Sequence, residues 1–312
     1  MRLRDVGELG LIARIERLAR EQPRSRSVVL GIGDDAALLR ARAGEDVVVT
    51  TDALVEGVHF RLDQETARVA GRRALAANLS DLAAMGARPL GFVLALAAPP
   101  SASLAAVLGI VRGMLDLGRR FACPLVGGNV TRARELSLSI CAVGAVARGR
   151  ALRRDRARPG DRIFVTGTLG GAALERARGR VRRTPEPRLG AGRALARLRG
   201  VGACIDVSDG LTSDLAHVCR ASGVRARIDS ARVPTPRGFA AACARARRDP
   251  LALALAGGED YELLFTLRPG AAGERALARR LGVPVAEIGV TEAGLPGIAG
   301  LPPGIGAGFR HF

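Results

Sequence analysis

The apolar residues of this chain follow two patterns, one repeating every second residue and one repeating every three or four. Short apolar runs predict strands over 28–30, 46–52, 91–97, 124–129, 136–146, 162–166, 202–206, 261–267 and 283–290. Apolar residues at helical spacing predict helices over 7–20, 64–85, 101–120, 211–221 and 271–281. Strands that alternate with helices along the whole chain are typical of an α+β protein built from α/β-type layers.

One segment interrupts this pattern. Residues 148–161 are dense in arginine and contain the pair Pro159–Gly160, a composition that is typical of linkers between domains. A chain of 312 residues is long enough for two domains. We therefore expect an N-terminal domain over 1–148 and a C-terminal domain over 149–312.

Composition places the chain among soluble globular proteins, since 48% of its residues are hydrophobic and 25% are charged. The longest apolar run, 91–98, is far shorter than the roughly 20 residues of a membrane span and ends at a Pro-Pro pair. The first residues carry charges without an apolar segment behind them. We therefore expect no signal peptide, no membrane partner and a cytoplasmic location.

The cysteines and histidines do not form the patterns of disulfide or zinc sites. The chain has 5 cysteines, an odd number, and no C-x-x-C pair. Each cysteine lies among apolar residues, so we expect buried free thiols. The 3 histidines are too few and too scattered for a histidine metal site.

The net charge of +18 is of the kind that nucleic-acid-binding proteins carry. However, the positive side chains are all arginines spread over the expected helices, tryptophan is absent and Tyr261 is the only tyrosine, so few stacking platforms for bases remain. We therefore expect no nucleic-acid partner. The absence of lysine also excludes a Walker A loop and a protein-kinase fold, because both need a phosphate-binding lysine.

Carboxylates are concentrated at predicted strand ends and beside glycines. They are Asp34, Asp35, Asp52, Glu56, Asp81, Asp206, Asp209, Glu259 and Asp260. Carboxylate oxygens without histidine or cysteine clusters favour Mg²⁺ over zinc. Mg²⁺ held in this way usually also binds the phosphates of a nucleotide, and glycine turns add N–H contacts to phosphate. The pattern favours phosphoryl transfer without a P-loop and leaves the substrate open.

Several of these residues also fit purely structural interpretations. The run Gly31–Ala36 matches the dinucleotide pattern G-x-G-x-x-A only loosely and equally fits a solvated acidic turn. Asp81 fits either a metal ligand or an exposed position on the outer face of its helix. His59 on an apolar strand fits a core histidine, and Phe309 near the end of the chain fits simple packing.

A series of motifs makes the pattern more specific. The motifs are GIGDDA at 31–36, TTDALVEGVHF at 50–60, NLSDLAAMG at 78–86, DVSDGL at 206–211 and GEDYEL at 258–263. In order and spacing this series resembles the thiamine-monophosphate kinase family, a branch of the aminoimidazole ribonucleotide synthetase superfamily. The resemblance extends from the first predicted helix to the last five residues.

The resemblance implies a two-domain fold of the aminoimidazole ribonucleotide synthetase type. In that fold the N-terminal domain binds ATP and metal and dimerises through its sheet, and the C-terminal domain completes the active site, so we expect a homodimer. The implied reaction transfers the γ-phosphoryl group of ATP to the phosphate of thiamine monophosphate, assisted by several Mg²⁺ ions. No general base is needed, because a phosphate oxygen is already a nucleophile.

The roles of the family carry over to the positions that match its motifs. The implied metal ligands are Asp35, Thr50, Thr51, Asp52, Asp81, Asn129, Asp206 and Asp209. Among them Asp35, Asp52, Asp81 and Asp209 have the catalytic role. The implied ATP contacts are Gly128, Asn129, Arg150 and Ser208, and the implied substrate contacts are His59, Glu259 and Phe309.

The chain departs from the family at one motif. Residues 127–132 read GGNVTR where the family usually has GGDTTR, so Asn129 removes one negative charge from the expected metal cluster. This departure keeps a pseudoenzyme open as an alternative. Another ATP-using member of the superfamily, a hydrogenase-maturation or synthetase-type enzyme with a different acceptor, is the second alternative.

Overall fold

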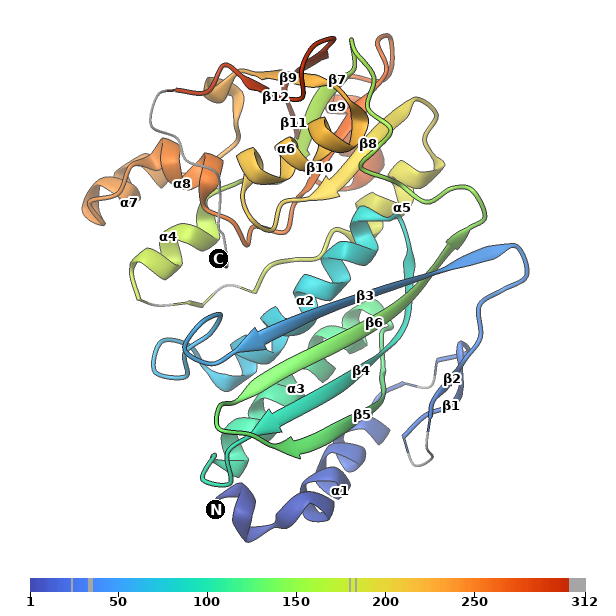
Figure 1. Ribbon diagram of the computed structural model, residues 1–312, viewed down its shortest axis with the longest axis vertical. Coiled ribbons are helices and arrows are strands. Elements are labelled where there is room, and N and C mark those ends of the chain that lie inside the picture. Colours follow the sequence, from blue (N-terminus) through green and yellow to red (C-terminus); the bar gives the residue numbers. More distant parts are fainter. Residues whose placement is uncertain (24, 33–35, 180, 183, 303–312) are drawn as a thin grey trace. The chain divides into compact units, whose positions relative to one another are not determined.

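The computed structural model describes residues 1–23, 25–32, 36–179, 181–182 and 184–302 (Figure 1). The chain forms two compact units. Unit 1 comprises Met1–Leu82, Arg88–Gly149 and Val181–Thr184, and unit 2 comprises Ala83–Ala87, Arg150–Arg180 and Pro185–Phe312. Each unit therefore contains a short segment that is separated in sequence from the rest of that unit.

Unit 1 is built on a sheet of strand order β3-β6-β4-β5. Its elements are η1 (Leu3–Asp5), α1 (Gly7–Arg20), β1 (Val28–Leu30), β2 (Leu38–Leu39), β3 (Glu45–Val55), α2 (Ala67–Ala84), β4 (Arg88–Ala98), α3 (Leu104–Phe121), β5 (Leu125–Arg132) and β6 (Ser137–Ala147). Strand β6 pairs antiparallel with β3 and with β4, whereas β4 and β5 are parallel. A parallel pair needs a crossover, and α3 provides it.

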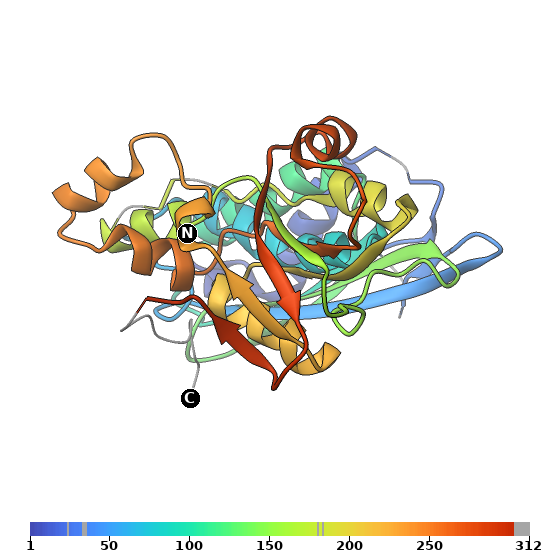
Figure 2. The same cartoon turned by 90° about the horizontal axis from the view of Figure 1, so that it is seen from above.

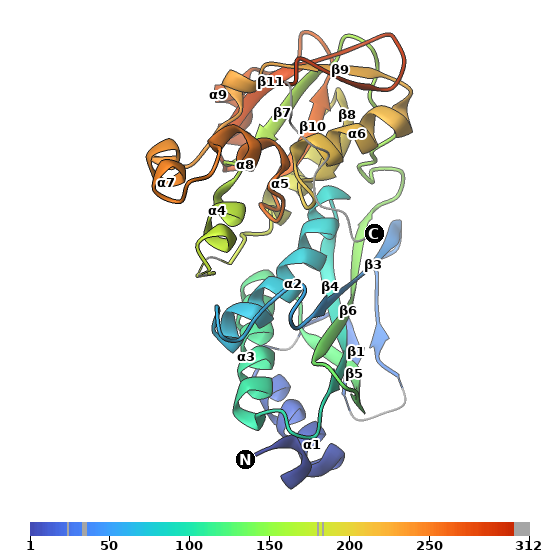
Figure 3. The same ribbon diagram turned by 60° about the vertical axis from the view of Figure 1, so that its left-hand side comes forward.

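Helices α2 and α3 cover one face of this sheet (Figures 1 and 3). Their backbones approach closely at two glycines. A Cβ atom at Gly71 would lie 1.9 Å from the carbonyl oxygen of Ile110, and one at Gly113 would lie 2.1 Å from that of Arg68. Only a residue without a side chain fits at either position. The two glycines thus allow α2 and α3 to pack closely against each other.

On the opposite face of the sheet, which we call the open face, the side chains in the middle of β3 are exposed. Side chains alternate along β3, so Val48, Thr50 and Asp52 face the helices while Val47 and Val49 point away from them. Val47 is 58% exposed and Val49 is 63% exposed. The open face therefore carries exposed β-branched side chains on a regular strand.

Unit 2 is built on a sheet of strand order β12-β9-β11-β7-β10-β8, in which only the pair β12 and β9 is parallel among the described strands. Its elements are β7 (Arg162–Thr166), α4 (Gly171–Ala177), α5 (Leu189–Arg197), β8 (Val201–Asp206), α6 (Leu211–Ser222), β9 (Arg225–Ile228), η2 (Ser230–Arg232), α7 (Phe239–Arg245), α8 (Pro250–Ala256), β10 (Leu263–Leu267), α9 (Glu274–Leu281), β11 (Val285–Glu292) and β12 (Gly297–Ala299). In the view from above, α7 and α8 lie to one side of these strands (Figure 2). Every residue of β10 is buried, which makes that strand part of the core of the unit.

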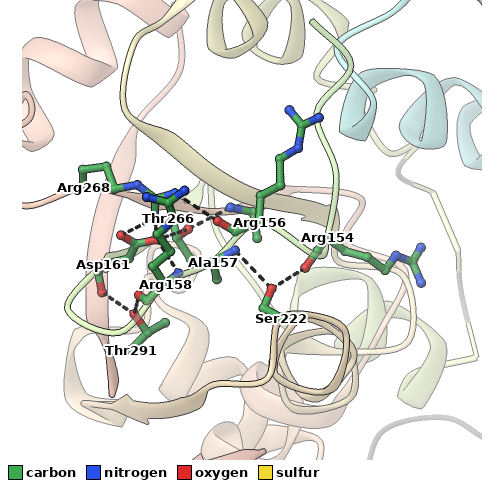
Figure 4. Close-up of polar contacts among 10 residues, drawn as sticks. Arg154, Arg156, Ala157, Arg158, Asp161, Ser222, Thr266, Arg268 and Thr291 are labelled. Atoms are coloured by element: carbon green, nitrogen blue, oxygen red, sulfur yellow. Dashed lines mark hydrogen bonds and ion pairs between the residues drawn. The ribbon is translucent and has the colours of Figure 1, made fainter. Parts of the chain in front are cut away.

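The segment that precedes β7 is fixed to unit 2 by a buried carboxylate (Figure 4). Asp161 has no exposed surface, and its Oδ2 accepts hydrogen bonds from the Arg158 N–H at 3.0 Å and from the Thr266 hydroxyl at 3.1 Å. The Arg268 guanidinium forms an ion pair with the same carboxylate at 2.5 Å. The Thr291 hydroxyl donates to the Arg158 carbonyl at 2.5 Å. The arginine-rich segment is therefore anchored through its backbone, and the side chains of Arg154 and Arg156 point away from the cluster.

The predicted strands and helices are present, with bounds that shift by a few residues. The α+β class with α/β-type layers is confirmed. The hydrophobic pattern did not reveal β2, α5, β9, α7, α8 or β12, because these elements are too short to show a clear period. In the described part of the chain, which includes every cysteine, no disulfide forms, and four cysteines are buried. Cys141 is only half-buried, on the open face of the unit 1 sheet, so the expectation that each thiol is buried is wrong for it. No helix within the described residues is long and apolar enough to cross a membrane.

Candidate functional site

In unit 1, a hydroxyl of the sheet contacts a carboxylate of the helix layer. Thr50 faces the helices from β3, and its hydroxyl donates a hydrogen bond to Asp81 Oδ2 of α2 at 2.5 Å. Asp52 follows two positions later on the same face of β3, as the strand period requires. Asp81 is half-buried, so it is not the exposed outer-face residue that the sequence also allowed. A strand and a buried helix thus bring side-chain oxygen atoms from two distant motifs to one face.

Two further expected ligands lie on the other face of the same sheet. Thr51 is exposed on β3, and its hydroxyl donates to the carbonyl of Ile140 on β6 at 3.0 Å. Asn129 is exposed on β5 and pairs with Ala95, an exposed position of β4. The side chains of Thr51 and Asn129 are therefore not brought together with Asp81. Their roles as ligands stay predictions.

The glycine turn that was expected to bind ATP forms part of the edge strand β5. A Cβ atom at Gly128 would lie 2.1 Å from the carbonyl oxygen of Leu94, so β4 and β5 can pair here only if this residue is glycine. Gly128 and Asn129 line a cavity of about 80 Å³ together with Glu16 of α1 and Leu96 of β4. Most residues that line the cavity are apolar.

A tight loop after β3 holds His59. The Val55 N–H donates to His59 Nδ1 at 3.0 Å, so the neutral ring carries its proton on Nε2. The His59 carbonyl accepts a hydrogen bond from Arg73 Nη2 at 3.0 Å, and the same arginine forms an ion pair with Glu65 at 2.5 Å. Both members of this ion pair are buried. A buried charge pair therefore fixes the loop that presents the histidine.

In unit 2, a buried carboxylate organises the turn that carries Ser208 and Asp209. Asp214 of α6 is 2% exposed, and its Oδ2 accepts the backbone N–H groups of Ser208, Asp209 and Gly210 at 3.0, 3.1 and 3.2 Å. Burial and, to a smaller extent, the negative charges of Asp206 and Asp209 raise the pKa of Asp214 to about 8, while the backbone N–H groups oppose this rise. Three carboxylates of one short segment thus repel one another.

A second turn of unit 2 lies beside the first. The Glu259 N–H donates to the Ser208 carbonyl at 2.6 Å, and the Tyr261 N–H donates to the Val207 carbonyl at 2.8 Å. Glu259 also forms an ion pair with Arg176 of α4. The motifs DVSDGL and GEDYEL, about fifty residues apart in the sequence, are therefore in direct contact within one unit.

Three predicted site residues remain to be placed. Arg150 is exposed at the start of the second segment of unit 2. Asp35 and Phe309 lie outside the described residues. Among the residues that the structure describes, no group of three or more His, Cys, Asp or Glu side chains is arranged to hold a metal ion. The roles assigned to these residues stay predictions.

Sequence reasoning missed Arg176 and the structural roles of Asp214 and Asp260. Asp214 has a local signal, since it lies at the first turn of the helix that follows DVSDG. Asp260 stands inside a recognised motif. Arg176 has no local signal, because it is one arginine among many and its partner Glu259 is distant in the sequence.

Comparison with known proteins identifies the family. Residues 33–146 match the model of the AIR synthase related protein N-terminal domain, and residues 158–298 match that of the C-terminal domain. The thiamine-monophosphate kinase of Escherichia coli K12 is 41% identical over 311 residues, which cover 94% of this chain and 92% of that protein. A crystal structure of thiamine-monophosphate kinase from Stenotrophomonas maltophilia K279a has a TM-score of 0.81 and 39% identity and covers 93% of this chain and 96% of its own.

A further solved structure contains bound molecules. It is described as AaThiL complexed with AMPPCP and TMP, and it has a TM-score of 0.76 and 29% identity over 100% of this chain and 99% of its own. The 41% identity to the Escherichia coli protein over nearly the full length of both chains, together with the matches to both domain models, establishes the family. The chain belongs to the thiamine-monophosphate kinase family of AIR synthase related proteins.

Proposed function

We propose that this protein phosphorylates thiamine monophosphate with ATP, giving thiamine diphosphate and ADP. The observation that carries the proposal is the similarity to thiamine-monophosphate kinases over nearly the full length of the chain. The AaThiL complex with an ATP analogue and TMP supports both substrates. The acceptor is itself a phosphate, so the protein must bring two anions into line and needs no base to activate the nucleophile.

We further propose that Mg²⁺ ions take part. The described donors are carboxylate and hydroxyl oxygens, which suit a hard cation. The carboxylates of Asp206 and Asp209 lie in one short segment that Asp214 holds through backbone N–H groups, and a divalent cation beside them would offset their negative charges. In unit 1 the candidates that share one face of the sheet are Asp52, Asp81 and Thr50. Bound Mg²⁺ would neutralise the phosphate oxygens.

The chain's own residues have positioning roles in this proposal. The Thr50 hydroxyl orients Asp81, and the Asp214 carboxylate holds the turn that carries Ser208 and Asp209. We propose that Gly128 and Asn129 contact ATP together with Arg150 and Ser208. His59 and Glu259 contact the acceptor, and Phe309 packs against it. Catalysis then comes from orientation and from charge neutralisation.

One assay tests the proposal directly. The purified protein is incubated with ATP, Mg²⁺ and thiamine monophosphate, and thiamine diphosphate is measured. Formation of thiamine diphosphate that requires all three supports the proposal. Turnover of ATP with another acceptor only would assign the protein to a different reaction of the superfamily. No turnover with any acceptor would support a pseudoenzyme.

Asn129 provides a test of the metal assignment. We propose that its amide in place of a carboxylate weakens one Mg²⁺ site, because one negative charge is missing. Asn129→Asp is then expected to reach half-maximal rate at a lower Mg²⁺ concentration than the natural chain. An unchanged Mg²⁺ dependence would remove Asn129 from the metal site.

We also propose that two copies of the chain associate through the open face of the unit 1 sheet. The exposed side chains of Val47 and Val49 support this, because apolar residues on a regular strand are costly to leave in water. Light scattering on the purified protein is expected to give the mass of a dimer. Val49→Asp is expected to lower that mass, whereas a monomeric natural chain would contradict the proposal.

A further inference from the structure

The loop Gly257–Tyr261, which we call the Glu259 loop, has an unusual backbone. Gly258, Glu259 and Tyr261 have φ angles of +64°, +60° and +50°. Glycine adopts this left-handed region easily, whereas glutamate and tyrosine do so at a cost. Non-glycine residues in this region persist only where surrounding contacts impose them, and such positions concentrate at functional sites. Contacts with neighbouring residues must therefore hold the Glu259 loop in this conformation.

Asp260 makes the first of these contacts. Its carboxylate accepts the N–H groups of Gly170 at 2.6 Å and of Ala172 at 3.3 Å. These groups belong to the turn that opens α4. Burial, with a smaller contribution from the charge of Glu262, raises the pKa of Asp260 to about 6, while the N–H groups and Arg176 oppose this rise. The Asp260 side chain thus fastens the middle of the Glu259 loop to α4.

Arg176, near the end of α4, makes the second contact. Its guanidinium forms an ion pair with Glu259 and donates a further hydrogen bond to the Gly257 carbonyl. One planar side chain therefore holds both the carboxylate of Glu259 and the backbone at the start of the loop. Arginine is suited to this because its donors form a rigid fork, whereas a lysine ammonium is a single point of attachment.

Glu259 keeps a partly accessible side chain in this arrangement, since 25% of it is exposed. Thiamine monophosphate has a cationic thiazolium ring and an amino group on its pyrimidine ring, and both favour a nearby carboxylate. A carboxylate whose orientation is already fixed binds such a group without a further loss of side-chain freedom. The two contacts from α4 would therefore contribute to substrate binding without touching the substrate.

We propose that Arg176 and Asp260 are positioning residues that hold Glu259 ready for the thiamine moiety of the acceptor. This inference rests on the proposed function, in which Glu259 contacts the acceptor. It extends that function to two residues of the same unit. It also gives a reason for the backbone of the loop, which α4 stabilises in the geometry that substrate binding needs.

Steady-state kinetics with varied thiamine monophosphate and varied ATP test the inference. Arg176→Met and Asp260→Asn are each expected to raise the KM for thiamine monophosphate about tenfold, with the KM for ATP changed less than about twofold. Arg176→Lys keeps the charge and is expected to fall between Arg176→Met and the natural chain. The matched control is Arg162→Met, because Arg162 likewise joins a carboxylate (Glu287) and a carbonyl (Ala271). Its loss is expected to leave both KM values unchanged.

A double-mutant cycle with Glu259→Gln separates positioning from general destabilisation. If Arg176 acts through Glu259, Arg176→Met has little further effect on the KM for thiamine monophosphate once Glu259 is changed. Additive effects of the two changes would overturn the inference. So would an unchanged KM for thiamine monophosphate in both Arg176→Met and Asp260→Asn.

Hydrogen–deuterium exchange of residues 257–261 measures directly how firmly the loop is held, and it does not require enzymatic activity. Faster exchange is expected there in Arg176→Met and Asp260→Asn, and not in Arg162→Met. Unchanged exchange in both variants would overturn the inference even if they are hard to assay. If the natural chain makes no thiamine diphosphate, the proposed function fails, and the exchange result still decides whether α4 holds the loop.

Discussion

The two units hold their candidate functional side chains in different ways. In unit 1, Thr50 lies on a long strand and Asp81 on the buried helix α2, which packs closely against α3 at two glycines. In unit 2, Ser208, Asp209 and Glu259 lie on turns, which are held by Asp214, Asp260 and Arg176 through polar contacts. A side chain on a regular element is held in place by the packing of the whole core, whereas a side chain on a turn is held in place by a few hydrogen bonds. We therefore expect that substituting a functional side chain in unit 1 lowers activity with a smaller loss of stability than a substitution in unit 2.

The largest effect is expected at Asp81. Asp81→Asn keeps the shape of the side chain and removes a negative charge that we place at the metal. It is expected to lower kcat/KM for thiamine monophosphate by at least about 100-fold. The free energy of unfolding should change by less than about 1 kcal/mol, because the helix itself is unaffected. Product formation and urea unfolding check both values.

Asp63→Asn is the control for Asp81, because Asp63 also lies in unit 1 but forms an exposed pair with Arg61. Its activity should match that of the natural chain. A small activity loss in Asp81→Asn would break the comparison, since the regular elements of unit 1 would then hold a side chain without a function.

Gly71 tests the scaffold of unit 1. A Cβ atom there would lie 1.9 Å from the Ile110 carbonyl oxygen. Gly71→Ala is therefore expected to lower the free energy of unfolding by about 1–3 kcal/mol, since α2 and α3 must move apart. Alanine otherwise favours helices by about 1 kcal/mol over glycine. Urea unfolding is the measurement.

At Gly190 of α5, replacement by alanine is expected to have the opposite effect on the free energy of unfolding. Nothing lies within 4 Å of a Cβ atom at this position, so Gly190→Ala should raise the free energy of unfolding by about 0.5–1 kcal/mol. Equal effects at Gly71 and Gly190 would mean that the close approach of α2 and α3 contributes nothing to stability.

Asp214 tests the turn of unit 2 through pH. Its folded-state pKa of about 8 lies above the ordinary value of 3.8. Between these values the folded protein binds more protons than the unfolded chain, so its contribution to stability is complete below about pH 4 and is lost as the pH rises through 8. Asp214→Asn does not titrate. The difference in free energy of unfolding between the natural chain and Asp214→Asn, measured without Mg²⁺, should fall as the pH rises through this window.

Added Mg²⁺ sharpens this test. A cation beside Asp206 and Asp209 would offset their negative charges and lower the pKa of Asp214. The pH dependence should then weaken when Mg²⁺ is present. A difference that is flat with pH in the absence of Mg²⁺ would show that Asp214 titrates in its ordinary range.

The smallest effect is expected for the exposed pair of Arg227 and Glu292 at the surface of unit 2. These side chains are 63% and 37% exposed, and exposed pairs contribute little because water screens them. Arg227→Met should change the free energy of unfolding by less than about 0.5 kcal/mol and leave the KM for both substrates unchanged. A larger loss would show that surface charges, and not only buried polar contacts, hold unit 2 together.

Much of the fold could be predicted because it depends on local patterns. The run of β-branched residues in 46–52 and the helical period in 7–20 predicted β3 and α1 correctly. Short helices such as α7 and α8 were missed because seven residues carry too little periodic signal. The same limit applies to β9, which has exposed arginines at alternate positions.

The candidate site was predictable in its chemistry and less so in its geometry. The sequence assigned the same role of metal ligand to the adjacent residues Thr50 and Thr51. In the structure their side chains lie on opposite faces of β3, and of the two it is Thr50 that contacts Asp81. The sequence gives no indication of this until the buried face of the sheet is known. Pairs such as Arg176 and Glu259 are also invisible locally, because many arginines could form the same ion pair.

By itself, the sequence determined the class of fold, most of its elements and the oxygen-rich chemistry of the motifs, since periodicity and residue type act over a few neighbouring positions. Tertiary structure alone decided which face each ligand occupies and which buried groups hold the turns. It decided these because residues far apart in sequence become neighbours only when the sheets and helices pack. The contact of Asp260 with the start of α4 is one such outcome, since the two segments lie about ninety residues apart.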